Sequence, residues 1–104
     1  MAGKRSESEI EKYLKERVEE IGGICDKWVS PGKKGVPDRI VFAPGGHVVF
    51  VETKREKGGV ISPLQTYRAS QLKSLGQHVY FIHTKEQVDT LVFFLKKGVV
   101  PRGV

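Results

Sequence analysis

The sequence predicts one α/β domain over residues 1–104, with its elements in the order α-β-β-β-α-β-α around a mixed sheet. Three observations lead to this prediction. The length of 104 residues suits a single compact domain with one core. Three segments carry helical patterns, each opened by a helix-capping motif. Four short runs rich in β-branched and aromatic residues read as strands.

The first predicted helix begins after Ser6, whose hydroxyl can cap the backbone of Glu9 while the Glu9 side chain returns the bond. Gly22-Gly23 ends this helix. A strand over 24–29 and a loop over 30–35 follow. Apolar residues recur along the helix at helical spacing, at Ile10, Leu14, Val18 and Ile21.

The next two strands, 38–43 and 47–53, are joined by Pro44-Gly45-Gly46 and predict a hairpin. The second strand is apolar on both faces over 48–51, as expected of a central strand buried on both sides.

The rest of the chain predicts two helices and one further strand of the sheet. Ser62-Pro63-Leu64-Gln65 combines an N-cap serine, a proline at the first helical position and a glutamine that completes the capping box. That helix ends at Gly76, and a strand over 78–83 follows. Thr84 with Gln87 then caps a last helix that runs to about Lys97.

The balance of charged residues indicates which class of binding partner to expect. Eighteen lysines and arginines against 12 acids give a formal charge of +6. This balance favours polyanions such as nucleic acid, although a basic protein without such a role would share it. No apolar run approaches a membrane span, so we expect no membrane partner. The single Cys25 lies in an apolar stretch, reads as core rather than nucleophile, and fits a reducing cytoplasm.

The hairpin carries the residues with the clearest chemistry. Glu52 and Lys54 are two apart on one strand and therefore share a face, at the end of an apolar run where unpaired charge is costly. A surface salt bridge would explain them too, since Glu-x-Lys is common. However, Asp38 opens the partner strand and should lie beside Glu52. Two adjacent carboxylates repel unless protonated or bridged by a cation, and an oxygen-rich pair suits Mg²⁺ or Mn²⁺.

Pro37-Asp38 followed by Glu52-Thr53-Lys54 resembles the signature of the PD-(D/E)xK nuclease superfamily. A fuller pattern resembles the virus-type replication-repair nuclease (VRR-NUC) family over about residues 6–92. It consists of Gly35-Val36-Pro37-Asp38, the spacing from Asp38 to Glu52, and the downstream Ser62-Pro63-Leu64-Gln65. PD…ExK alone is a weak motif; the combination is specific. The resemblance implies a restriction-endonuclease-like core.

It also implies a Mg²⁺- or Mn²⁺-dependent DNA endonuclease that acts on structured or branched DNA in a phage or bacterial host cell. Asp38, Glu52 and the carbonyl of Thr53 would bind the metal, and Lys54 would place water or neutralise charge on a phosphate. Two alternatives stay open. One is a catalytically silent DNA-binding module of the same fold, and the other is a nuclease acting on RNA or unstructured DNA.

The family also carries a glutamate on the first helix. Glu7 lies on the stripe of Ile10 and Leu14 and is the first choice, with Glu11 at the edge of that stripe second. A first-turn acid that complements the helix dipole is the simpler explanation of Glu7. Glu9 is explained by the capping box.

Gln65 falls on the inward stripe of the second helix with Ala69 and Leu72. It can complete the capping box, contact the attacking water or a phosphate, or do both; the resemblance favours an active-site position. Trp28 fits a core or rim position, or it could stack on a base. A basic group brackets the proposed metal site and could guide a phosphodiester backbone, or be ordinary solvated surface. Its members are Lys33, Lys34, Arg39, Arg55 and Lys57.

The last helix predicts a homodimer. Its apolar stripe suffices to cover the sheet, which leaves Phe93 on roughly the opposite side. The tail Gly98-Val99-Val100-Pro101 that follows has no evident partner in so small a domain. A two-fold dimer would carry two metal sites and could make paired cuts in a branched junction, as resolvases of this superfamily fold do. The alternative is a monomer whose tail folds over Phe93.

Overall fold

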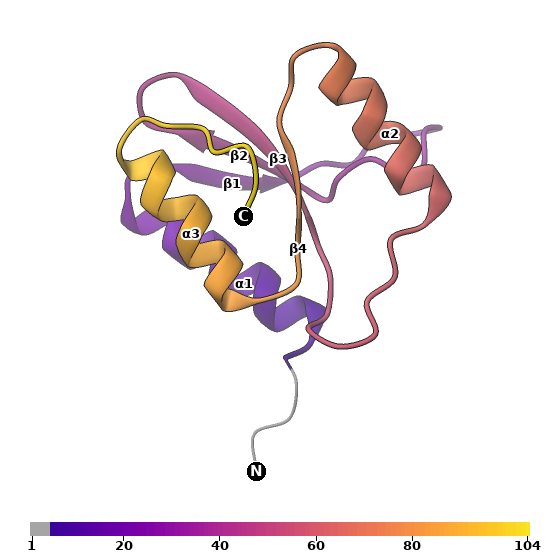
Figure 1. Cartoon of the computed structure of the whole chain (residues 1–104), viewed down its shortest axis with the longest axis horizontal. Coiled ribbons are helices and arrows are strands. Elements are labelled where there is room, and N and C mark those ends of the chain that lie inside the picture. The colour runs from indigo at the N-terminus through magenta and orange to yellow at the C-terminus, as the bar shows by residue number, and fades with distance from the viewer. Residues whose placement is uncertain (1–4) are drawn as a thin grey trace.

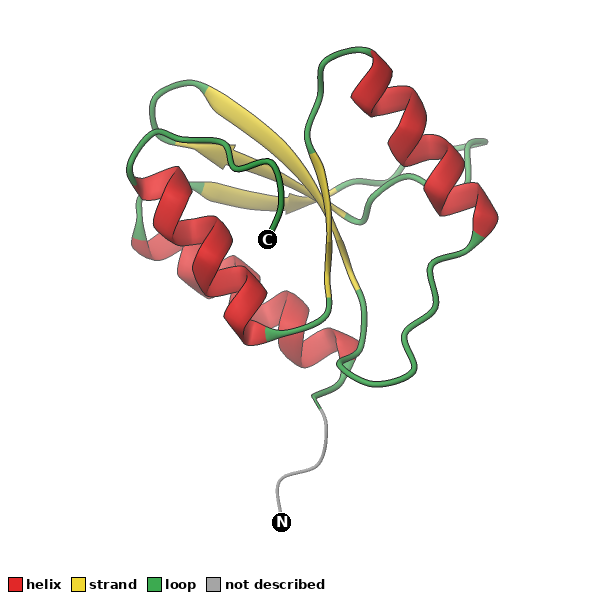
Figure 2. Ribbon diagram, viewed as in Figure 1, coloured by secondary structure: helices red, strands yellow, loops and turns green. Residues whose placement is uncertain are grey.

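The computed structural model describes residues 5–104 as a mixed four-stranded sheet with helices on both faces (Figure 1). Helices α1 and α3 pack together on one face, and α2 stands at the other (Figure 2). The predicted order and the mixed sheet are confirmed. In chain order the elements are α1 (Glu7–Glu20), β1 (Ile24–Lys27), β2 (Arg39–Ala43), β3 (His47–Thr53), α2 (Pro63–Ser74), β4 (Val79–Ile82) and α3 (Lys85–Lys96).

Local signals account for where these elements begin and end. All three predicted capping boxes are present, at Ser6–Glu9, Ser62–Gln65 and Thr84–Gln87. In the β2–β3 turn, Gly45 and Gly46 have φ angles of 88° and 85°, a backbone conformation that favours glycine. β1 and β4 are shorter than their predicted runs of 24–29 and 78–83.

The strand order is β1-β2-β3-β4. β1, β2 and β3 pair antiparallel, whereas β4 lies parallel to β3 and is reached by a crossover through α2. The register Arg39↔Val51 places the residue before β2 next to the end of β3. This juxtaposition builds the site described below.

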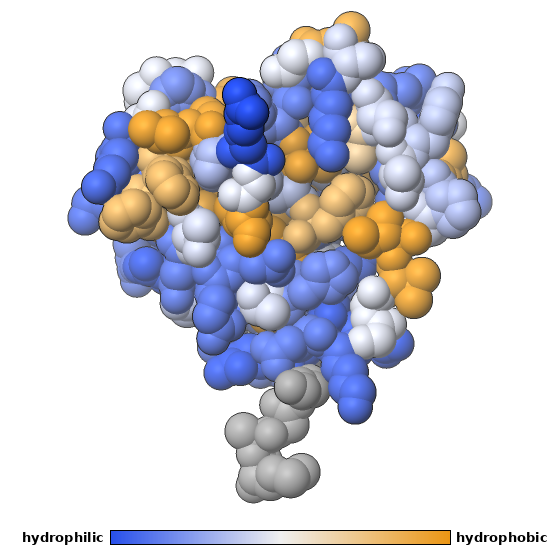
Figure 3. Space-filling model, in the orientation of Figure 1, coloured by the Kyte–Doolittle hydropathy of each residue, from blue (hydrophilic) through white to orange (hydrophobic). Residues whose placement is uncertain are grey.

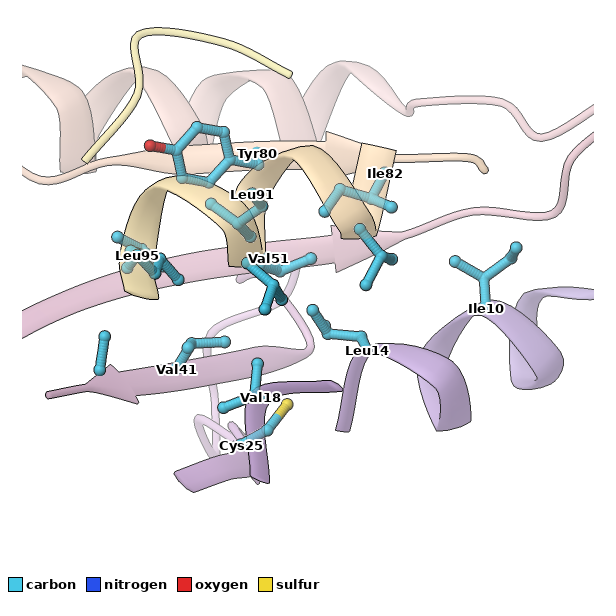
Figure 4. Packing of buried hydrophobic residues seen from close by; sticks show 14 residues of the cluster. Ile10, Leu14, Val18, Cys25, Val41, Val51, Tyr80, Ile82, Leu91 and Leu95 are labelled. Atoms are coloured by element: carbon cyan, nitrogen blue, oxygen red, sulfur yellow. The ribbon is translucent and has the colours of Figure 1, made fainter. Parts of the chain in front are cut away.

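The core lies between the sheet and the α1–α3 pair (Figure 4). Alternate residues of the central strands, such as Val41 and Val51, point into it, and α1 contributes its predicted stripe. Leu91 and Leu95 of α3 are fully buried above them. Each such side chain contributes about 1.5–3 kcal/mol through burial. Cys25 also lies here, and burial raises the pKa of its thiol to about 11.

The prediction that β3 is buried on both faces is only partly correct. β3 is central, but only Val49 and Val51 of the 48–51 run are fully buried, while Val48 remains 37% exposed. α2 makes its main sheet contacts with β4, so it does not cover the far strands. Ile24, Phe42 and Val48, which are register partners across three strands, form an exposed apolar row there.

A second prediction, that the C-terminal segment has no packing partners in the domain, is wrong. Pro101 is buried, and its carbonyl accepts a hydrogen bond from the Tyr80 hydroxyl. Val100 and Val104 pack against the core. The segment turns back at Gly98 and covers the end of the core, leaving Phe93 54% exposed. Within residues 5–104, no helix has the length and apolar character needed to span a membrane.

Candidate active site

The two predicted carboxylates lie side by side. The β2–β3 hairpin brings Asp38 next to Glu52, and the backbone N–H of Asp38 donates to Oε1 of Glu52 at 3.1 Å. The Asp38 carboxylate accepts hydrogen bonds from Thr53, at 3.2 Å from the backbone N–H and at 2.9 Å from the hydroxyl. Each carboxylate is therefore oriented by the neighbouring strand.

Both carboxyl groups are held in an environment that disfavours their charge. Glu52 is only 6% exposed, and burial followed by the charge of Asp38 raises its pKa to about 7. Burial also raises the pKa of Asp38, although the two hydrogen bonds from Thr53 oppose this shift. A cation between the two groups would relieve both effects.

Lys54 and Gln65 complete a closed polar cluster around Glu52. The ammonium of Lys54 lies 3.4 Å from Oε2 of Glu52 and donates to Oε1 of Gln65 at 2.9 Å. The Gln65 amide donates from Nε2 to Oε2 of Glu52, also at 2.9 Å. Its Oε1 accepts a second bond, from the N–H of Ser62 at 3.0 Å. Gln65 thus makes the capping bond and contacts both charged groups.

Strand alternation explains why these charges can be buried. Val51 and Thr53 point to the core, so Glu52 and Lys54 point to the face where α2 stands. α2 then supplies Gln65 to both of them. An unpaired charge in this position would cost several kcal/mol. In the described part of the chain, no buried side-chain nitrogen or oxygen lacks a hydrogen-bond partner.

The structure places the two candidate glutamates of α1 differently. Glu11 is engaged, because its Oε2 accepts a hydrogen bond from Nε of Arg39 at 2.7 Å. Glu7 is exposed and lines a hollow with Lys54 and Gly59. The charges of both glutamates add to the upward shift in the pKa of Asp38.

The basic group divides into exposed and buried members. Lys33, Lys34 and Lys57 are exposed. Arg55 is exposed too, and its guanidinium donates to the carbonyl of Gly58 at 3.0 Å.

Arg39 differs from its predicted role as a DNA-binding residue, since it is only 8% exposed. It shares the core-facing side of β2 with Val41, so its guanidinium is directed toward α1. There it bonds Glu11 and donates to the carbonyl of Cys25 at 3.0 Å. Arg39 therefore ties α1 to the sheet and is not among the cations exposed to a ligand.

The donor set is suited to a hard divalent cation. Two carboxylates and a backbone carbonyl at the end of β3 offer the oxygen ligands that Mg²⁺ and Mn²⁺ prefer. Across residues 5–104, no group of three or more His, Cys, Asp or Glu side chains is arranged to hold a metal ion. Glu7 is therefore not positioned as a third direct side-chain ligand.

One residue near the site was missed from the sequence. Arg68 lies one helical turn beyond Gln65, and its Nε donates to the carbonyl of Lys34 at 2.9 Å. It ties the basic loop after β1 to α2. Its i, i+3 spacing from Gln65 was the available signal, since such residues are neighbours on a helix surface.

The chain is similar to known proteins in sequence and in fold. It is 42% identical over 80 residues to the "Putative nuclease p44" of Acyrthosiphon pisum secondary endosymbiont phage 1, covering 77% of this chain and 85% of that protein. A solved structure described as a VRR_NUC domain matches with a TM-score of 0.79 and 33% identity, covering 84% of this chain and 94% of the other. No family model matches the sequence.

Proposed function

Because the chain belongs to the VRR-NUC nuclease family, we propose that it hydrolyses phosphodiester bonds in DNA with a divalent cation held by Asp38, Glu52 and the carbonyl of Thr53. The observation that carries this proposal is the closed cluster of Glu52, Lys54 and Gln65 beside the Asp38 carboxylate. Burying its charges carries a desolvation cost that a salt bridge at the protein surface would not have.

The residues take distinct roles in this proposal. A bound Mg²⁺ or Mn²⁺ would supply a Lewis acid that polarises the phosphoryl oxygens. The Lys54 ammonium, directed into the same cluster, orients the attacking water or neutralises charge that develops on the phosphate. Gln65 holds Lys54 and Glu52 in place and contacts the water or a phosphate. Glu7 completes the site through water, since it is not arranged as a direct ligand.

Exposed cations support DNA as the substrate. Lys33, Lys34, Arg55 and Lys57 lie in the loops beside the cluster, where they can neutralise backbone phosphates. Branched or structured DNA is the proposed form, by resemblance to the family. The phage origin of the relative supports a bacterial host cell as the place of action.

We also propose that the protein acts as a homodimer. Apolar residues lie at the surface over α3 and the segment after it (Figure 3). Phe93 is 54% exposed and Val99 is 47% exposed. The Lys97 ammonium lies 4.4 Å from the centre of the Phe93 ring, an arrangement that a partner could shield from water. Two sites related by a two-fold axis could cut opposite strands of a junction.

A cleavage gel tests the proposed function. Labelled duplex, flap, single-stranded and four-way-junction DNA are incubated with the protein and Mg²⁺ or Mn²⁺, with EDTA and an RNA hairpin as further arms. We expect metal-dependent cuts, most rapid on the branched substrates. Binding without cleavage at any metal concentration would instead indicate a silent DNA-binding module. Preferential cutting of RNA or unpaired DNA would overturn the substrate assignment.

A further inference from the structure

A pocket of about 340 Å³ lies between the loop after β1 and helix α2. Its aromatic wall is Trp28, which is half-buried and backed by the Phe50 ring at 5.3 Å between ring centroids. The backbone N–H of Trp28 donates to the carbonyl of Asp38 at 2.9 Å. This backbone pairing links the residue that forms the aromatic wall to Asp38 of the catalytic cluster.

The walls of this pocket are held in place without a ligand. The guanidinium of Arg68 binds the carbonyl of Lys34 at 2.9 Å and so fastens the loop to α2. Gly35 packs so tightly on α2 that a Cβ there would lie 2.7 Å from Cγ of Leu64, and its φ angle of 85° also requires glycine. A preformed site loses little conformational entropy when a ligand enters.

The chemistry of the lining matches a nucleotide. Trp28 and Leu72 provide an aromatic and apolar lining, to which the largely exposed Leu75 also contributes. Among the described residues that line the pocket, the charged ones are Lys33 and Arg68, both basic. An apolar interior with a cationic rim complements a flat base attached to a phosphodiester backbone, because stacking on aromatic rings accompanies phosphate contacts in single-strand binding.

We infer that this pocket receives one unstacked base of the DNA strand that is cut, an inference that rests on the proposed function. Helix α2 relates the pocket to the cluster: Leu72 lies seven residues beyond Gln65, or ~10 Å along the axis at 1.5 Å per residue. That distance corresponds to roughly three nucleotides of a stacked strand. A base displaced near the cut would favour branched or distorted DNA, where bases are already unstacked.

The fluorescence of Trp28 tests this inference, because it is the only tryptophan in the chain. The wild-type protein in EDTA is titrated with single-stranded DNA, with duplex carrying one unpaired base, and with fully paired duplex; binding is followed separately by anisotropy. We expect bound DNA with an unpaired base to lower the fluorescence by about half. An abasic strand, which keeps the phosphates, should bind without this change. The paired duplex could also quench Trp28 while the fluorescence of a 2-aminopurine placed in that duplex rises. This result would support the pocket and show that the protein flips a paired base into it.

Two variants supply an independent readout. Trp28→Leu should bind single-stranded DNA about tenfold more weakly, whereas Trp28→Phe should stay within about threefold of wild type. Ile24→Leu, at an exposed position of the preceding strand β1, is the matched control. Should Trp28→Leu fail to fold by circular dichroism, the wild-type titration decides alone.

The outcomes separate this inference from the proposed function. If DNA binds without changing the Trp28 fluorescence, the pocket does not receive a base, even if the protein cleaves DNA. Equal quenching by the abasic strand would lead to the same conclusion. Base-dependent quenching by a protein that never cleaves would support the pocket and overturn the nuclease proposal. A protein that binds none of these DNAs would overturn the base-binding role of the pocket, while the cleavage gel with branched DNA and metal would still decide the nuclease proposal.

Discussion

The backbone N–H of Asp38 donates to the carboxylate of Glu52, a residue 14 positions away, at 3.1 Å. The Asp38 carboxylate in turn accepts from both the N–H and the hydroxyl of Thr53. Each carboxylate is thus oriented by the other's strand, and Glu52 is also held by the side chain of Gln65. Substitutions that keep shape but remove charge should therefore separate chemistry from folding.

Glu52→Gln and Asp38→Asn should each lower the rate of Mg²⁺-dependent cleavage by at least ~100-fold, because an amide is a poor substitute for a carboxylate ligand. Lys54→Ala should do the same through loss of the ammonium. DNA binding in EDTA should change little. Rates are measured on a labelled junction, and Mg²⁺ affinity by calorimetry. Either amide variant cleaving at the wild-type rate would remove that residue from the proposed metal site.

Gln65→Ala should lose both stability and activity, and Gln87→Ala supplies the matched control. Each glutamine completes a capping box, so Gln87→Ala should cost ~1 kcal/mol in urea unfolding. Gln65→Ala should cost more, because it also removes hydrogen bonds to two buried charged groups. Only Gln65 also contacts Glu52 and Lys54, so only Gln65→Ala should slow cleavage, by about tenfold or more. Equal cleavage by the two variants would leave Gln65 with a capping role alone.

Without divalent metal, the free energy of unfolding should fall as the pH rises from about 4.5 to about 7. Burial raises the pKa of Glu52 from 4.5 to about 7, so the folded protein keeps a proton that the unfolded chain has released. The contribution of Glu52 is therefore complete below pH 4.5 and is lost as the pH passes 7, by up to ~3 kcal/mol. The difference between wild type and Glu52→Gln in urea unfolding isolates it. A difference independent of pH would contradict the prediction.

Lys33→Ala combined with Lys34→Ala should weaken binding to unrelated DNA sequences equally. The slope of log Kd against log salt should fall by ~2, the value for two lost phosphate contacts. Lys12→Ala with Lys96→Ala removes the same charge from exposed positions on the helices of the other sheet face and should leave the slope close to wild type. If both pairs lower the slope alike, the effect reflects net charge rather than the loop.

Phe93→Asp should convert the dimer into a monomer in light scattering at micromolar concentration and abolish symmetric cutting of a four-way junction. Ile24→Asp is the matched control, since Ile24 is a similarly exposed apolar residue on the uncovered sheet face. If only Ile24→Asp dissociates the dimer, the sheet face is the interface. A monomeric wild type that still cuts both strands symmetrically would contradict the dimer itself.

Local signals in the sequence determined the order of elements and the pairing of Asp38 with Glu52. Capping boxes act within four residues, and the Pro44-Gly45-Gly46 turn sets the hairpin register. Alternation along a strand then decides that Glu52 and Lys54 share a face. None of these inferences needed a contact between distant segments.

Only the tertiary structure decided which cations are exposed and what α2 covers. Arg39 belongs to the same basic group as Lys33 in the sequence, but it meets Glu11 across 28 residues and is buried. Arg68 fastens a loop 34 residues away and so forms the wall of the Trp28 pocket. Such contacts depend on how helices pack on the sheet, a long-range outcome of the whole core that no local spacing encodes.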